Sequence, residues 1–178
     1  MSRRRSRPPL VVGWREWVLL DGLDCDVPIK AKVDTGAATS ALHAPGLKRF
    51  ERDGEAWASF WLRPRQRTTL DSRRVEVPII GERRVRSSNG KSELRPVIES
   101  SITIGDRKWA IELTLTRRDK MTFRMLLGRK ALRGRAIVDV SCSHAAGLPY
   151  VIAPEPVDAP EPVDTPEPPA DADRPETP

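Results

Sequence analysis

The feature that most constrains this chain is an apolar strand that ends in the turn Asp34-Thr35-Gly36. The strand delivers one carboxylate into a turn of small residues. Gly36 lets the backbone approach closely because it has no Cβ, and the Thr35 hydroxyl is placed to lock the turn with a hydrogen bond. A carboxylate held in this way suits proton transfer to and from a water molecule. The tripeptide alone is equally typical of a strand that ends in an Asx turn.

A second segment far along the chain favours the catalytic interpretation of this turn over an ordinary Asx turn. An apolar strand at residues 125–127 runs into Gly128-Arg129 and then into a short helical turn. The combination resembles the retropepsins, the retroviral-type aspartic peptidases, which pair an Asp-Thr-Gly loop with a downstream Gly-Arg segment. The resemblance implies that residues 34–36 are catalytic and that Gly128 and Arg129 give structural support to the site.

The surroundings of Arg129 differ from that pattern. Retropepsins carry an aspartate shortly after the Asp-Thr-Gly that pairs with the arginine of the Gly-Arg segment, whereas this chain has Ala38 and Thr39 in those places. We therefore expect Arg129 to have another partner and the floor of the cleft to differ.

The spacing of apolar segments predicts an all-β fold. Short apolar stretches alternate with turn residues every 8 to 12 positions or so, which is typical of a barrel or a sandwich, and the helical pattern at 130–133 is brief and late. Residues 10–20 are expected to form one strand. Trp57 and Trp61 share a strand face and are expected in the core. The retropepsin resemblance narrows the prediction to a closed β-barrel with a single lobe per chain and one short helix near its end.

The resemblance extends to a narrower group of proteins. The matching residues are 12–18, 32–44, 86–90, 95–98, 113–122 and 126–141. Over roughly residues 11–144 the chain is similar to the bacterial retropepsin-like family known as RimK-associated or "ATP-dependent zinc" proteases. That family is associated with glutamate ligases that extend a ribosomal protein, so the resemblance implies a peptidase acting on acidic, glutamate-rich tails.

The sequence contains no His-Glu-x-x-His helix, no paired cysteine motif and no phosphate-binding Gly-Lys-Ser/Thr loop. We therefore expect neither a metal nor another cofactor.

The segment between the two loops predicts a hairpin. Residues 82–86 alternate, Asn89-Gly90 is a strong turn signal, and residues 91–98 return. In retropepsins a hairpin at this position covers the substrate as a flap and bonds to its backbone. A solvated surface hairpin is the alternative. The expected substrate-binding residues are Ala37, Arg83, Arg86, Ser88, Asn89, Gly90 and Arg95.

Charge divides the chain into three expected parts. These are a disordered basic arm at 1–9, a peptidase-like domain at 10–152 and a disordered, acidic, proline-rich tail at 153–178. The tail has eight acids and one base, which leaves +13 on the rest of a chain whose total charge is +6. A body this basic expects an anionic partner (an acidic peptide, RNA or the ribosome, or an anionic membrane face) unless its charges only solvate the surface. One hypothesis is that the tail docks on the basic cleft as a pseudo-substrate.

Hydrolysis of a peptide bond by carboxylates requires two of them. One is ionised and takes a proton from water, and the other is protonated and polarises the scissile carbonyl. The sequence has one Asp-Thr-Gly, so the simplest arrangement is a homodimer in which Asp34 of each copy meets at the two-fold axis. Asp139, in another matching segment, is expected to support the structure or the dimer, although a role within one chain stays open.

Cysteine and histidine usage adds three secondary expectations. Cys25 and Cys142 make at most one pair, and no apolar run approaches the ~20 residues of a spanning helix. A cytoplasmic protein with reduced thiols and no membrane contact is therefore expected. His43 is expected to pack in the structure rather than to bind a metal or transfer protons.

The sequence is consistent with three hypotheses for function. The favoured one is a homodimeric aspartic endopeptidase that acts on acidic tails. The second is a non-catalytic module on the same fold that recognises an acidic tail. The third is a basic protein that associates with RNA or the ribosome.

Overall fold

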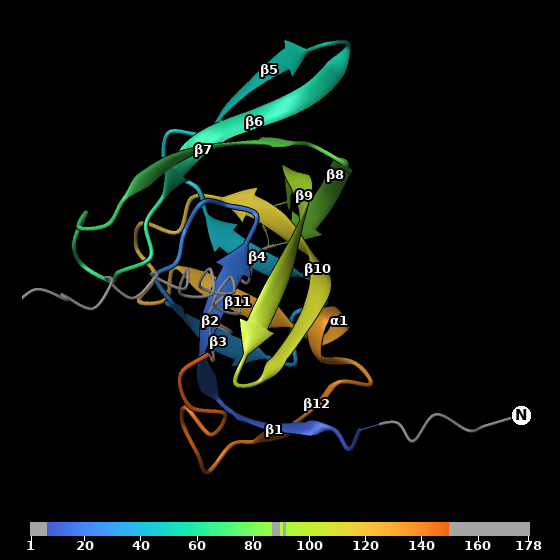
Figure 1. Ribbon diagram of the computed structural model, residues 1–178. Helices are drawn as coiled ribbons and strands as arrows, with labels where there is room; N and C mark the ends of the chain where they lie inside the picture. The colour runs from blue at the N-terminus through green and yellow to red at the C-terminus, as the bar shows by residue number, and fades with distance from the viewer. Residues whose placement is uncertain (1–6, 87–89, 91, 150–178) are drawn as a thin grey trace, which may run out of the picture.

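The chain is built from short strands with one short helix, in agreement with the all-β prediction. The computed structural model describes residues 7–86, 90 and 92–149 (Figure 1). The predicted tail, most of the predicted arm, Ser88 and Asn89 lie outside these residues, so the domain limits stay a prediction. The elements are β1 (Leu10–Gly13), β2 (Arg15–Asp21), β3 (Ile29–Asp34), β4 (Ser40–His43), β5 (Lys48–Arg52), β6 (Glu55–Leu62), β7 (Arg73–Pro78), β8 (Gly81–Arg86), β9 (Ser92–Ile104), β10 (Arg107–Thr116), β11 (Met125–Gly128), α1 (Arg129–Leu132) and β12 (Ala136–Asp139).

Six of the strands close into a barrel. Neighbouring strands follow the order β10-β4-β11-β3-β2-β9, and β9 pairs again with β10, which completes the ring. β8 pairs with the first half of the long strand β9 and so extends the sheet as a hairpin. The predicted closed β-barrel with one short late helix is confirmed.

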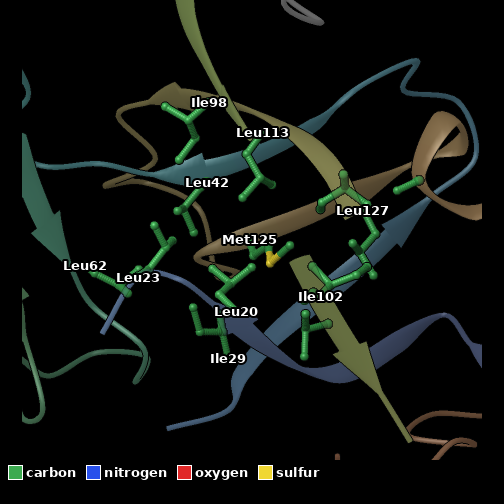
Figure 2. Packing of buried hydrophobic residues seen from close by; sticks show 14 of the residues in the cluster. Leu20, Leu23, Ile29, Leu42, Leu62, Ile98, Ile102, Leu113, Met125 and Leu127 are labelled. Atoms are coloured by element: carbon green, nitrogen blue, oxygen red, sulfur yellow. The ribbon is translucent and has the colours of Figure 1, made fainter. Parts of the chain in front are cut away.

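Aliphatic side chains fill the barrel (Figure 2). In β3, Ala31 and Val33 are buried while Lys32 points outward, because successive side chains of a strand face opposite sides. Each large aliphatic side chain removed from water stabilises the fold by about 1.5–3 kcal/mol. The core therefore holds rigidly the loops that leave the strand ends. Its fully buried members include Leu20, Leu23, Ile29, Leu42, Ile98, Ile102, Leu113 and Met125.

A second sheet, β5-β6-β7, rises from the barrel and carries the two tryptophans predicted for the core (Figure 1). That prediction was wrong. Ala58 and Phe60 of β6 are fully buried, so the alternate residues of that strand face the other way, and Trp61 is 40% exposed. Trp57 is partly buried. The shared face of Trp57 and Trp61 was predicted correctly, but the side of the sheet that faces the barrel was not.

Residues 10–20 form two strands rather than the predicted one. β1 pairs in parallel with β12, β2 enters the barrel, and the break falls at Trp14. A Cβ at Gly13 would lie 2.5 Å from the carbonyl oxygen of Cys142, so only glycine fits where these segments cross. The buried carboxylate of Glu16 secures the break, because its Oε1 accepts the N–H of Gly13 at 2.6 Å.

Two further features of the described residues bear on the expectations from sequence. No helix within 7–86, 90 and 92–149 is both long and apolar enough to cross a membrane. Cys25 is buried and Cys142 is exposed, and both are free thiols.

Candidate active site

Asp34 is the last residue of β3 and lies beside Gly128, the last residue of β11. The two strands pair in parallel, so the loops that follow them leave the sheet together. The backbone N–H groups of Gly36 and Ala37 both donate to Oδ1 of Asp34, at 3.1 Å each. These bonds orient the carboxylate, while its Oδ2 has no hydrogen-bond donor in the described part of the chain.

The Gly128-Arg129 segment packs directly against the loop that carries Asp34. A Cβ at Gly128 would lie 2.5 Å from the carbonyl carbon of Thr39, so only glycine allows this approach. Nη1 of Arg129 donates to the carbonyl oxygen of Gly36 at 2.9 Å. The partner that the sequence left open for Arg129 is therefore the backbone of the Asp34 loop rather than a carboxylate.

A cleft of about 550 Å³ opens beside Asp34. Arg95 is ion-paired with Glu93 at 2.7 Å, whereas the other cations of the cleft make no ion pair within the described residues. Positive charge of this density around one carboxylate favours an anionic ligand. The cations are Lys32, Arg86, Arg95 and Arg118, and Trp14, Phe123 and Leu126 supply apolar walls.

Arg118 reaches this cleft from the loop between β10 and β11. Its Nε donates to the carbonyl oxygen of Phe123 at 3.2 Å, which fixes the direction of the side chain. Burial and the cation of Arg95 lower the pKa of Arg118, and the carboxylate of Asp34 opposes that effect. Because an arginine ordinarily titrates far above neutrality, Arg118 remains a cation in the same cleft as Asp34.

His43 anchors the same loop from a buried position on β4. It is almost fully buried at the end of β4, and its Nδ1 accepts the backbone N–H of Arg118 at 2.9 Å. Burial, and then the nearby cation of Arg124, lower the pKa of His43 to about 4. The imidazole is therefore neutral near pH 7 and acts as a structural acceptor, the packing role expected for it.

The Asp34 loop and the Gly128-Arg129 segment, packed against each other, both lie within the part of the chain that matches a known family. Residues 11–147 match the family described as RimB-like, the retropepsin-like aspartic endopeptidase RimB. This chain belongs to the RimB-like family. The resemblance to bacterial retropepsin-like proteins linked to glutamate ligation is thereby confirmed.

Relatives of this RimB-like chain carry ligase names. A "Probable alpha-L-glutamate ligase" of Parasynechococcus marenigrum (strain WH8102) is 46% identical over 138 residues, which are 78% of this chain and 29% of that protein. A protein of the same name from Shewanella pealeana is 44% identical over 137 residues, 77% of this chain and 30% of the relative. The chain thus spans less than a third of the length of the curated relatives it matches.

A solved structure shares the RimB-like fold. The crystal structure of Lpg0085, a protein of unknown function from Legionella pneumophila, superposes with a TM-score of 0.64 at 26% identity. The match covers 77% of this chain and 98% of that one. The barrel is therefore shared across nearly the whole of the Legionella chain.

The RimB-like fold gathers some predicted site residues and separates others. Asp34, Ala37, Arg86 and Arg95 line one cleft, and Thr35 and Gly36 are exposed at the tip of the loop. Arg83 lies outside that cleft, in a second pocket.

Four other predicted residues stand apart from the cleft or lie outside the described residues. Gly90 is exposed with a φ of +81°, which suits the predicted turn, whereas Ser88 and Asn89 lie outside the described residues. Asp139 accepts hydrogen bonds from the backbone and side chain of Ser141, which lower the pKa of Asp139. Its bonds therefore stabilise the turn after β12 rather than the Asp34 loop.

Two cations of the RimB-like cleft were missed from sequence. Lys32 lies two residues before Asp34 and so shares its strand face, a local signal that was available. Arg118 gave no such signal, because its position depends on the buried contact with His43. In the described part of the chain, no three His, Cys, Asp or Glu residues are grouped so as to hold a metal ion.

Proposed function

We propose that this protein is an aspartic endopeptidase whose catalytic carboxylate is Asp34. The observation that carries the proposal is the setting of that carboxylate: Oδ1 is oriented by two backbone N–H groups, and the side chain faces a cleft large enough for a peptide. The ionised carboxylate would take a proton from a water molecule as the water attacks the scissile carbonyl. Membership of the RimB-like family supports this assignment.

The second carboxylate would come from a second copy of the chain. Asp34 is the single acid that lines the cleft within the described residues. Thr35 and Gly36, at the tip of its loop, are exposed, as they must be for two such loops to meet on a two-fold axis. Two carboxylates in contact share one proton, so one Asp34 would be the base while the other donates to the carbonyl oxygen.

Acidic, glutamate-rich tails are the substrate that the cleft suits best. Lys32, Arg86 and Arg118 make no ion pair within the described residues, so a glutamate carboxylate supplies a partner that the cleft lacks. The relatives named as glutamate ligases support this choice. In each of them, a segment similar to this chain is part of a longer polypeptide that is named as a glutamate ligase. A peptidase in that setting would act on the product of such a ligase.

The deciding experiment offers the protein a peptide with an oligoglutamate tail and weighs the products. We expect cleavage by the wild-type chain and none by Asp34→Asn, with peptide binding retained in the variant. Cleavage at the wild-type rate by Asp34→Asn would contradict the catalytic assignment. Binding without cleavage by both proteins would favour the non-catalytic recognition module on the same fold.

A further inference from the structure

A second basic pocket, here called the distal pocket, lies close to the Asp34 cleft. It has a volume of about 440 Å³ and lies between β4, β8, β10 and the segment that includes α1. Its wall includes one acid, Glu112, among the described residues. The cations that line it are Arg83, Lys130, Arg133 and Arg135.

The distal pocket adjoins the cleft along the β8–β9 hairpin. Arg83 of the distal pocket and Arg95 of the cleft are paired directly across the two strands. Such cross-strand partners project on the same face, with Cβ atoms about 4.5–5.5 Å apart. On the floor, Thr39 of the distal pocket follows Ala37 of the cleft by two residues. The distal pocket is therefore the neighbouring site for a ligand chain that extends from the cleft along this hairpin.

The distal pocket is lined by more cationic side chains than acidic ones. Arg83 is ion-paired with Glu112 at 2.7 Å, but Nη1 of Arg83 is buried without a hydrogen-bond partner among the described residues. Lys130, Arg133 and Arg135 make no ion pair in the part of the chain that the structure describes. Gathering these like charges costs Coulomb energy that a bound anion offsets. A carboxylate that bonds to arginine in the bidentate manner fits this requirement.

We infer that the distal pocket binds a second carboxylate of the same acidic peptide, several residues from the bond held at Asp34. The inference rests on the proposed function for the peptide's identity, but it concerns a separate site. The affinity of the protein then depends on the length of the acidic tail. A short acidic peptide occupies only the cleft, whereas a longer one also reaches the distal pocket. An extended chain advances about 3.3 Å per residue, so a few added glutamates span the two pockets.

The test measures binding of oligoglutamate peptides to the full chain carrying Asp34→Asn, which prevents turnover. Fluorescence anisotropy gives the affinity of peptides of about three and about ten residues at one low ionic strength. We expect the longer peptide to bind about tenfold more tightly or better. This length ratio should fall towards one when Arg83→Gln and Arg135→Gln are added.

A matched pair of substitutions controls for the loss of net charge. Arg52 is ion-paired with Glu76 as Arg83 is with Glu112, and Arg67, like Arg135, has no ion pair among the described residues. Arg52→Gln with Arg67→Gln should preserve the length ratio. Equal loss in both double variants would overturn the inference, because a general electrostatic field would then explain the binding. The single variant Arg135→Gln, at an exposed position, should move the ratio in the same direction if the double variant unfolds.

The two proposals fail in different ways. If the wild-type chain cleaves acidic peptides but long and short peptides bind equally well, the distal pocket is overturned and the peptidase stands. If no cleavage occurs but the length ratio depends on Arg83 and Arg135, the distal pocket stands without the peptidase. Binding of inorganic phosphate or single-stranded RNA that depends on these two arginines, with no binding of oligoglutamate, would overturn the inference.

Discussion

The backbone N–H of Arg118 donates a 2.9 Å hydrogen bond to Nδ1 of His43, so a buried histidine holds in place the loop that brings a cation into the Asp34 cleft. Nδ1 accepts this bond only when it carries no proton. Burial ensures that state near neutral pH, because it lowers the pKa of His43 to about 4. The geometry of the cleft is thereby linked to a buried group at the end of β4.

The protein should become less stable as the pH is lowered, because of His43. Its pKa is about 4 in the folded protein and 6.5 ordinarily, so the unfolded chain binds the proton first as the pH drops. The contribution of the neutral imidazole is therefore complete above pH 6.5 and is lost as the pH falls from there towards 4, by at most about 1.4 kcal/mol per pH unit. Urea unfolding at about pH 7 and about pH 5 measures this loss.

The matched variant for this prediction is His43→Asn, which places an oxygen near the position of Nδ1 and does not titrate. We expect a shallower dependence of unfolding free energy on pH in His43→Asn. A residual slope is expected from His144, whose pKa is lowered by burial and by the cations of Arg15 and Lys30. An unchanged slope would show that His43 does not control the loss of stability.

Replacing Arg118 by glutamine should weaken the action on acidic peptides. The cleft then loses a half-buried cation that lines it together with Asp34, and charge-assisted bonds from such a cation contribute about 1.5–3 kcal/mol. We expect kcat/KM for an oligoglutamate peptide to fall by roughly tenfold or more, with a smaller effect on a neutral peptide. Arg117→Gln is the control, since Arg117 is exposed and pairs with Asp119. Equal losses in the two variants would argue against a specific role for Arg118.

Alanine at Gly128 should damage both the fold and the site. The added Cβ would lie 2.5 Å from the carbonyl carbon of Thr39, and backbone on both sides leaves no flexible group to move. We expect a loss of roughly 2 kcal/mol or more in unfolding free energy. Gly81→Ala is the control, because nothing lies within 4 Å of a Cβ there. Similar unfolding curves for both variants would contradict the close approach.

Mixing wild-type and Asp34→Asn chains should test the shared dyad. If each active unit needs one Asp34 from each copy, mixed dimers are inactive. An equal mixture, exchanged to equilibrium at constant total protein, should retain about one quarter of the wild-type activity. Active sites that are complete within one chain would retain about one half instead. Sedimentation velocity on the same samples would establish the oligomeric state.

Local sequence patterns were sufficient to predict much of the fold and the centre of the candidate site. The turn at Asp34 and the Gly128-Arg129 segment are recognisable because turn chemistry and period-two alternation act over a few residues. The break at Gly13 was not recognisable, because it is imposed by Cys142 at the other end of the domain. The exposure of Trp61 was missed for a related reason, since alternation shows that two faces differ but not which face meets the barrel.

The sequence by itself determined that a rigid β framework presents one carboxylate in a tight turn, and that a basic body surrounds it. Only the tertiary structure decided which cations reach that carboxylate. Lys32 and Arg118 come to it from different elements, while Arg83, expected at the same place, lines the distal pocket. The physical reason is that strand pairing and buried contacts such as His43 with Arg118 join residues far apart in the chain, and no local pattern records those distances.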